Sequence, residues 1–197
     1  LKNAVIAAED QRFYQHWGVD VLGVARAIIG NITSGGVQSG ASTITQQVAK
    51  NFYLSNERTF TRKFNEALLA YKIEQSLSKD QILELYFNQI YLGQRAYGFA
   101  AAAQIYFNKP VQELTLAEAS MLAGLPKAPS AFNPVVNPER AKLRQAYILN
   151  NMQELGMITT QQKAQAMAEE LHYERFVQQI DQSALYVAEM ARQELYE

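Results

Sequence analysis

The sequence predicts a mainly α-helical fold. Ser78–Gln81 and Thr115–Glu118 both have the spacing of a capping box, in which the side chains at the two ends of a first helical turn satisfy backbone amides. Apolar residues recur every three or four positions after both segments, as they do along one face of a helix. Alternating strand patterns bounded by turn dipeptides are nearly absent.

The individual elements follow from the same signals. Apolar periodicity places helices near residues 3–14, 20–33, 42–54, 60–77, 79–92, 98–107, 115–124, 138–155, 160–171 and 184–196. Asn137 before Pro138 is a typical helix start, and Gly156 stands where that helix should end. Loops are expected at 34–41, 93–98 and 125–138. The last loop holds four of the five prolines, which predicts a stiff surface crossing.

Composition excludes several classes of function. A length of 197 residues is enough for one domain with a core, and for two lobes. The net charge of −1 gives the whole molecule no general attraction to nucleic acid. Because the chain has no cysteine, disulfides, thiolate metal sites and a cysteine nucleophile are excluded. No apolar run reaches the roughly 18 residues of a membrane-spanning helix.

Glu9 is the first candidate for chemistry. On a helix over 3–14 it shares a face with Arg12 and Phe13. A carboxyl beside Phe13 and Trp17 could lose water, which would raise its pKa toward the range of a general base. The alternative is a solvated surface glutamate paired with Arg12, a common contact worth only ~0.3 kcal/mol. Spacing alone favours this alternative.

The second candidate is a basic cluster between Gly40 and Ala67. A glycine-containing loop there leads into a helix start rich in hydroxyl and amide side chains, which favours an anion. These side chains belong to Ser42, Thr43, Thr45, Gln46 and Gln47. Four basic residues follow, with Glu57 as the one acidic residue among them: Lys50, Arg58, Arg62 and Lys63. The cluster suits a phosphate or pyrophosphate, although the P-loop pattern is missing and nucleotide hydrolysis is therefore disfavoured.

The same cluster has a simpler interpretation. Arg62 and Lys63 precede Glu66 by four and three residues, the spacing of an ordinary ion-pair ladder on an exposed helix. Taken one residue at a time, the ladder is the better interpretation.

Several blocks taken together resemble a known family. EDQRFYQHWGVD, GASTITQQ, RKFNE and KDQILELYFNQIYLG are similar to the signature blocks of the peptidoglycan glycosyltransferases. These are the glycan-polymerising domains of class A penicillin-binding proteins and of their monofunctional relatives. The resemblance runs from Val5 to about Ile158 and includes LAEASMLAGLPKAPSAFNP and RQAYIL, in the family's order. One conservative departure is Ile148, where the family often has valine.

The resemblance implies a mainly α, lysozyme-like two-lobed domain with a small membrane-facing lobe, expected over residues 1–183. It implies an inverting transfer that polymerises lipid II into β-1,4-linked glycan strands and releases undecaprenyl pyrophosphate. The domain would act on the periplasmic or extracellular face of the bacterial inner membrane and would be a target of the inhibitor moenomycin. Residues 184–197 resemble the start of a linker toward a transpeptidase domain, which favours a bifunctional parent protein.

Roles for single residues also follow from the resemblance. Glu9 matches the catalytic glutamate that takes the proton of the acceptor 4-hydroxyl, and Glu66 matches a second glutamate near the donor pyrophosphate. Three further groups are expected: Lys50, Arg58, Arg62 and Lys63 neutralising the diphosphate; Ser42, Gln46 and Gln47 lining the site between the lobes; and Phe13, His16 and Asp20 shaping the chain after Glu9. Asn88 and Arg144 are expected to be structural. No cofactor is required, but a divalent cation, Mg²⁺ or Mn²⁺, could sit at the donor pyrophosphate.

Two rival functions remain at this point. A lysozyme-like hydrolase could use Glu9 as a general acid, but it would not need the basic cluster. A non-catalytic helical binding module, for example for nucleic acid, could use that cluster, but the near-zero net charge and the carboxylates inside the cluster argue against it.

The segment Val19–Ile32 is the expected membrane contact. It is too short to span a bilayer, and Asp20 and Arg26 interrupt it. Its pattern fits a buried core helix as well as an interfacial helix with apolar residues at headgroup depth. The family resemblance favours the interfacial helix.

Overall fold

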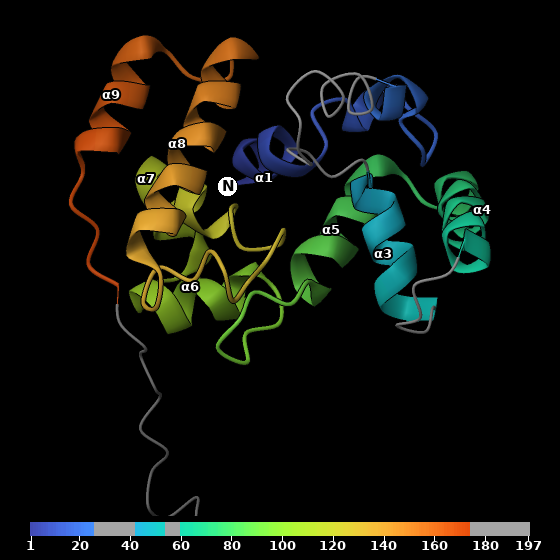
Figure 1. Cartoon of the computed structure of the whole chain (residues 1–197), viewed down its shortest axis with the longest axis horizontal. Helices are drawn as coiled ribbons and strands as arrows, with labels where there is room; N and C mark the ends of the chain where they lie inside the picture. Colours follow the sequence, from blue (N-terminus) through green and yellow to red (C-terminus); the bar gives the residue numbers. More distant parts are fainter. Residues whose placement is uncertain (26–41, 54–59, 174–197) are drawn as a thin grey trace, which may run out of the picture.

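The structure is a computed structural model, which describes residues 1–25, 42–53 and 60–173 (Figure 1). Within these residues the α-helices are α1 (Lys2–Glu9), α3 (Ile44–Tyr53), α4 (Phe60–Ser76), α5 (Lys79–Gln89), α6 (Phe99–Phe107), α7 (Leu116–Leu122), α8 (Pro138–Glu154) and α9 (Thr160–Ala168). Two short 3₁₀ turns, η1 and η2, cover Phe13–Gln15 and Val111–Glu113. The described part contains no strand, only an isolated antiparallel bridge between Tyr91 and Tyr97. The mainly α fold is confirmed.

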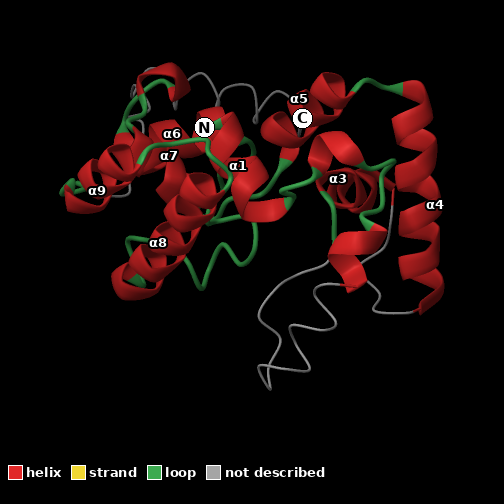
Figure 2. Ribbon diagram, turned by 90° about the horizontal axis from the view of Figure 1, so that it is seen from above, coloured by secondary structure: helices red, strands yellow, loops and turns green. Residues whose placement is uncertain are grey.

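The helices form two groups. Helices α3, α4 and α5 pack against one another, and α1, α7, α8 and α9 form the second group, in which α6 contacts α7. Helix α5 joins the groups, because it contacts α3 on one side and α6 on the other. Figures 1 and 2 show the same division from two directions, with α4 at one end of the molecule and α9 at the other. We call the α3–α5 group the small lobe and the other group the large lobe.

The predicted helix starts are confirmed at several places. Ser78 and Thr115 each form a complete capping box, with Gln81 and Glu118 as the reciprocal partners. Helix α8 begins at Pro138, but the Asn137 side chain makes no capping bond and donates to the Ser130 carbonyl at 3.1 Å instead. Gly156 follows α8 with φ at +68°, as expected of a glycine that ends a helix.

The first helix is shorter than the sequence predicts. Instead of continuing to residue 14, α1 ends at Glu9, and Asp10 already has a φ of −157°. The carboxylate of Asp10 accepts hydrogen bonds from the Ile44 backbone amide at 3.0 Å and from His16 at 2.9 Å. Contacts with residues that lie outside the helix therefore override its local helix signals. Glu9 becomes the last helical residue, at the point where the chain turns.

Helix α1 is buried along most of its length. Ala4, Val5, Ile6 and Ala7 are at most 4% exposed, so this helix runs through the core of the large lobe. The same hydrophobic core contains large side chains that are fully enclosed, among them Phe13, Tyr86, Tyr106 and Leu149. Close packing of this kind fixes a backbone, so the end of α1 is held firmly.

Some sequence predictions fall outside the described residues. Residues 21–25 are helical, which agrees with the start of the expected helix at 20–33, but the remainder of that helix and the loop at 34–41 are not described. The helix at 184–196 and the proposed linker at 184–197 lie outside as well. Among the helices that are described, none has the length and apolar character needed to cross a membrane.

Candidate active site

Glu9 is held by partners from two distant helices. Its Oε2 accepts a hydrogen bond from the Gln47 side-chain amide on α3 at 2.9 Å. Its Oε1 accepts one from the Arg144 guanidinium on α8 at 3.2 Å. The side chains of Glu9 and Arg144 are only 10% and 8% exposed. The expected surface pair of Glu9 with Arg12 is wrong, because the Arg12 guanidinium binds Asp20 at 3.1 Å.

The large lobe makes room for Arg144 and orients it. A side chain at Gly124 would place its Cβ 2.9 Å from the Arg144 Cγ, so a glycine lets the arginine lie flat against that segment. The guanidinium also donates to the Ala8 carbonyl at 3.3 Å and lies 4.9 Å from the ring centroid of Tyr147. Arg144 therefore binds both the carboxylate and the backbone at the end of α1.

Burial raises the pKa of the Glu9 carboxyl above its ordinary value, since the charged form loses water. The Gln47 hydrogen bond and the positive charges of Arg144 and Lys127 act in the opposite direction without cancelling this effect. Tyr86, which is buried and donates to the Gln47 amide oxygen at 3.3 Å, closes the other side of this contact. The result is a carboxyl whose pKa is moved toward neutrality, the property of a general base.

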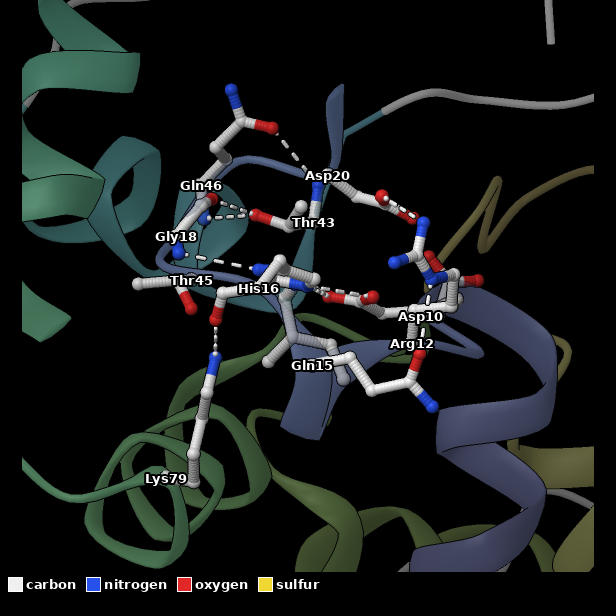
Figure 3. A network of polar contacts seen from close by, with 12 residues as sticks. Asp10, Arg12, Gln15, His16, Gly18, Asp20, Thr43, Thr45, Gln46 and Lys79 are labelled. Carbon is white, nitrogen blue, oxygen red and sulfur yellow. Dashed lines mark hydrogen bonds and ion pairs between the residues drawn. The ribbon is translucent and has the colours of Figure 1, made fainter. Parts of the chain in front are cut away.

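The residues after Glu9 form a polar network that ties α1 to the small lobe (Figure 3). His16 Nδ1 accepts from the Gly18 amide at 3.2 Å, so its Nε2 carries the proton and donates to Asp10 at 2.9 Å. The Thr43 hydroxyl donates to the Gly18 carbonyl at 2.5 Å. His16 thus acts as a structural link, as expected of the residues that shape the chain after Glu9.

The start of α3 is built by the same network. Thr43 and Gln46 form a reciprocal cap: the Gln46 oxygen accepts from the Thr43 amide at 3.0 Å, and the Thr43 hydroxyl accepts from the Gln46 amide at 3.1 Å. Gln46 is 4% exposed, whereas its neighbour Gln47 reaches Glu9. Of the two adjacent glutamines, the structure thus brings only Gln47 into contact with the candidate base.

Glu66 is the second buried carboxylate. Its side chain is 3% exposed and lies between Arg62 Nη1, at 3.1 Å, and Lys63 Nζ. Lys63 also donates to the Ser42 hydroxyl at 2.8 Å, across from α4 to the residues before α3. The predicted spacing of three and four residues is confirmed, but the ladder is buried at its carboxylate rather than exposed. The three side chains together carry a net positive charge.

The remaining basic residues are placed differently. Lys50, in the last turn of α3, is exposed and makes no hydrogen bond or ion pair with the part of the chain that the structure describes. Arg58 lies outside the described residues. The structure therefore joins Ser42, Arg62, Lys63 and Glu66 in one cluster and leaves Lys50 apart from it.

Comparison with known proteins identifies the family. The model of the Transglycosylase family matches residues 1–153, which is most of the chain. The chain belongs to the transglycosylase family. It is 86% identical over all 197 residues to penicillin-binding protein 1A of Neisseria cinerea, and 53% identical over 193 residues to that of Pseudomonas aeruginosa. It spans about a quarter of the length of these relatives.

A solved structure agrees with this assignment. The transglycosylase domain resembles the crystal structure of penicillin-binding protein 1A from Haemophilus influenzae, with a TM-score of 0.50 and 35% sequence identity. The match covers 77% of this chain and 19% of that one. The expected family, the enzyme class and the lysozyme-like two-lobed helical fold are confirmed.

The described part of the transglycosylase domain has no metal site made of protein ligands alone. No group of three or more metal-ligating side chains is present in residues 1–25, 42–53 and 60–173. Glu66, the carboxylate expected near the pyrophosphate, already has two cationic partners. A divalent cation at the donor pyrophosphate, where phosphate oxygens would supply most of the ligands, stays a prediction.

Sequence reasoning missed three members of the Glu9 site. Arg144 was expected to be structural, yet it is the cation on the candidate base. Lys127 and Tyr86 were not selected, although Lys127 acts on Glu9 by its charge and Tyr86 holds Gln47. One available signal was the family block RQAYIL, which begins with Arg144. Local spacing could not relate this arginine to Glu9, which lies 135 residues earlier.

Proposed function

We propose that this transglycosylase domain polymerises lipid II into β-1,4-linked glycan strands and releases undecaprenyl pyrophosphate, with Glu9 as the general base. The observation that carries this proposal is the buried Glu9 carboxyl, with its raised pKa, fixed by Gln47 and Arg144. An acceptor hydroxyl has a very high pKa, so it needs a base at the moment of attack.

The reaction needs two groups on opposite faces of the donor sugar. Glu9 takes the proton from the acceptor 4-hydroxyl while the hydroxyl oxygen bonds to the donor anomeric carbon. The bond from that carbon to the pyrophosphate oxygen breaks, and the leaving group departs with the electron pair, which inverts the α-linkage to β. Charge builds up on the pyrophosphate, where Arg62 and Lys63 would stabilise it.

The start of α3 contacts both the candidate base and the cationic cluster. Gln47 binds Glu9, and Ser42, five residues earlier, binds Lys63. One segment thus reaches both the candidate base and the cationic cluster, as a displacement with a base on one side and a charged leaving group on the other requires. The role of Glu66 in this proposal is to position Arg62 and Lys63 on α4.

A comparison of two substrates tests the proposed reaction. The protein is incubated with lipid II in one experiment and with polymerised glycan in another, and the products are separated by size. We expect glycan strands from lipid II, blocked by moenomycin, and no shortening of polymerised glycan. Shortening of the polymer without growth from lipid II would establish the hydrolase that uses Glu9 as an acid.

We also propose that the small lobe meets the membrane that carries the lipid-linked substrates, on the outer face of the bacterial inner membrane. Four apolar side chains follow one another along one face of α4 at helical spacing: Phe60, Phe64, Leu68 and Tyr71, which are 97%, 65%, 48% and 49% exposed. Trp17, Val21 and Leu22 are also exposed. Apolar groups gathered on one surface support an interfacial membrane contact.

Vesicle binding tests the membrane contact. Replacing Phe60 and Phe64 by serine should reduce co-sedimentation with anionic lipid vesicles while the melting temperature stays near that of the parent protein. Leu143→Ser on α8, which is 72% exposed but lies on the other lobe, is the matched control and should bind vesicles normally. Normal binding by the double variant would contradict the proposal. Ile28 and Ile29, the residues first expected to insert, lie outside the described residues.

The remaining length of the relatives supports a second activity in the parent protein. Because the chain spans a quarter of proteins named penicillin-binding protein 1A, we propose that a transpeptidase domain follows it there. Labelling of the full-length protein by a fluorescent penicillin should place the label outside residues 1–197. Absence of any label would contradict a bifunctional enzyme.

A further inference from the structure

A pocket lies where the connection between α5 and α6 faces the proline-rich segment 125–137. Its volume is about 380 Å³. Tyr91, Gln94 and Arg95 line it from the α5–α6 connection. Ser130, Asn133 and Val136 line it from the opposite segment. None of these residues takes part in the proposed reaction, so the pocket needs a separate explanation.

The α5–α6 connection has an unusual backbone at the pocket. Gly93, Gln94 and Arg95 all have positive φ angles, of 81°, 48° and 63°. Such a conformation costs a residue other than glycine on the order of 1–2 kcal/mol. It is held by hydrogen bonds from the Ala96 amide to the Gly93 carbonyl at 2.7 Å and from the Leu92 amide to the Ala96 carbonyl at 2.9 Å. The fold therefore holds the backbone of Gln94 and Arg95 in this conformation at the pocket.

Two hydrogen-bond donors at the pocket have no protein partner among the described residues. Asn133 is only 5% exposed, and its side-chain oxygen accepts from the Val135 amide at 2.9 Å, but its amide nitrogen makes no hydrogen bond in the described structure. The guanidinium of exposed Arg95 likewise makes no hydrogen bond or ion pair with described residues. The Asn133 amide nitrogen reaches solvent, so both donors are available to a ligand at the pocket. The pocket is thus suited to a ligand rich in acceptors.

One side of the pocket is aromatic, because Tyr91 lines it and Tyr97 lies against Tyr91. The rings of Tyr91 and Tyr97 lie 5.1 Å apart, and the two residues are 43% and 65% exposed. Aromatic faces of this kind offer an apolar platform with a polar edge, which suits the C–H face of a sugar ring. The planar guanidinium of Arg95 beside them can form two parallel hydrogen bonds with a carboxylate.

Two segments connect the pocket to the Glu9 site. Lys127, whose charge acts on Glu9, comes two residues before Pro129 at the pocket, and two residues span at most about 7 Å. On the other side, Tyr86 contacts Gln47, and Tyr91 follows it just beyond the end of α5. A polymer unit next to the reacting sugar would therefore be within reach of the pocket.

We propose that this pocket binds an N-acetylated amino sugar that carries a carboxylate-ended peptide, with Arg95 on the carboxylate, the Asn133 amide nitrogen on a carbonyl and the tyrosine rings against the sugar. This inference rests on the proposed function, because the repeat unit of the growing strand has this chemistry.

The test is direct binding rather than turnover. A lipid-free disaccharide tripeptide is titrated calorimetrically into the full-length protein carrying Glu9→Gln, with penicillin present to occupy any penicillin-reactive site. Arg95→Ala should weaken binding by about tenfold or more, since a charge-assisted hydrogen bond is lost. Asn133→Asp keeps the oxygen that accepts from Val135 and removes the amide donors, so it should also weaken binding. Arg95→Lys should recover part of the affinity.

Controls separate this inference from other effects. Arg140→Ala, an exposed arginine on α8, should bind like the parent protein. The disaccharide without its peptide should bind more weakly, and Arg95→Ala should then have little further effect. Stronger binding of a strand of several repeats than of one unit would assign the pocket to the product, and equal binding would assign it to the acceptor. Because no turnover is involved, the result does not depend on whether Glu9 is the base. Unchanged affinity in Arg95→Ala, or no measurable binding by the parent protein, would overturn the proposal.

Discussion

Glu9 and Glu66 are both buried carboxylates with hydrogen-bond partners, but they are built in opposite ways. The partners of Glu66 are Arg62 and Lys63, one turn earlier on the same helix. The partners of Glu9 are Gln47 and Arg144, which come from other helices 38 and 135 residues away. Both hydrogen-bond partners of Glu66 are cations, whereas those of Glu9 are one cation and one neutral amide.

This difference indicates a separate role for each carboxylate. A carboxylate between two cations on its own helix is suited to hold those cations in place. A carboxyl at a helix end, buried by several elements and with a raised pKa, is suited to accept a proton. Substitutions at these two carboxylates and at their partners can test this division.

Replacing Glu9 by Gln should have the largest effect. The amide keeps the shape of the side chain but cannot accept a proton, and loss of a general base typically costs ~10²–10⁴-fold in rate. Glycan polymerisation from lipid II measures the loss, and thermal unfolding checks that the protein stays folded. Near-normal turnover at matched stability would show that Glu9 is not the base. The proposed difference in role between Glu9 and Glu66 would then be wrong.

Removing Arg144 should affect both stability and pH dependence. Arg144→Met leaves a buried carboxylate without its cation, which costs about 3–5 kcal/mol. Since the base must be deprotonated, activity rises with pH through the pKa of Glu9. Arg144 lowers that pKa, so its loss should move the rise to higher pH. The pH profile of kcat/KM measures the shift. Arg144→Lys keeps the charge and should shift the profile less, and an unshifted profile in Arg144→Met would show that the arginine is only structural.

Substitutions in the cationic cluster and at the isolated Lys50 should differ in their effect on stability. Arg62→Ala should lower both stability and use of the lipid-linked donor, because Arg62 is a partner of buried Glu66. Lys50→Ala should lower donor use by roughly tenfold, because its ammonium has no partner among the described residues and is available to the donor diphosphate. It should change stability by less than about 0.5 kcal/mol, since Lys50 is exposed. Donor and acceptor kinetics with chemical denaturation measure these effects, and raised salt should depress the parent protein more steeply than either variant. Equal losses of folding and activity in both variants would favour a plain ion-pair ladder.

Ser42→Ala should have the smallest effect. The Ser42 hydroxyl accepts from Lys63 at 2.8 Å at an exposed position, a contact worth about 0.5–1.5 kcal/mol. Donor use should fall by a few-fold, with acceptor use unchanged. A loss as large as that of Glu9→Gln would mean that Ser42 takes part in the reaction itself.

Most of the helices and several of their ends were predictable from the sequence alone. Helices α3 to α9 lie within a few residues of the predicted ranges, because their signals are local: capping boxes at Ser78 and Thr115, a proline at position 138 and a glycine at position 156. The ladder of Arg62, Lys63 and Glu66 was predictable for the same reason, since three and four residues are one helical turn. Ordered sequence blocks also identified the family.

The surroundings of Glu9 arise from tertiary contacts that the sequence did not predict. The early end of α1 results from hydrogen bonds between Asp10 and residues 6 and 34 positions further along the chain. The ion pair with Arg144, the burial that raises the pKa of Glu9 and the charge of Lys127 beside it all come from elements that local spacing does not relate. Local rules describe one helix at a time, whereas the pKa of a carboxyl depends on everything that packs around it.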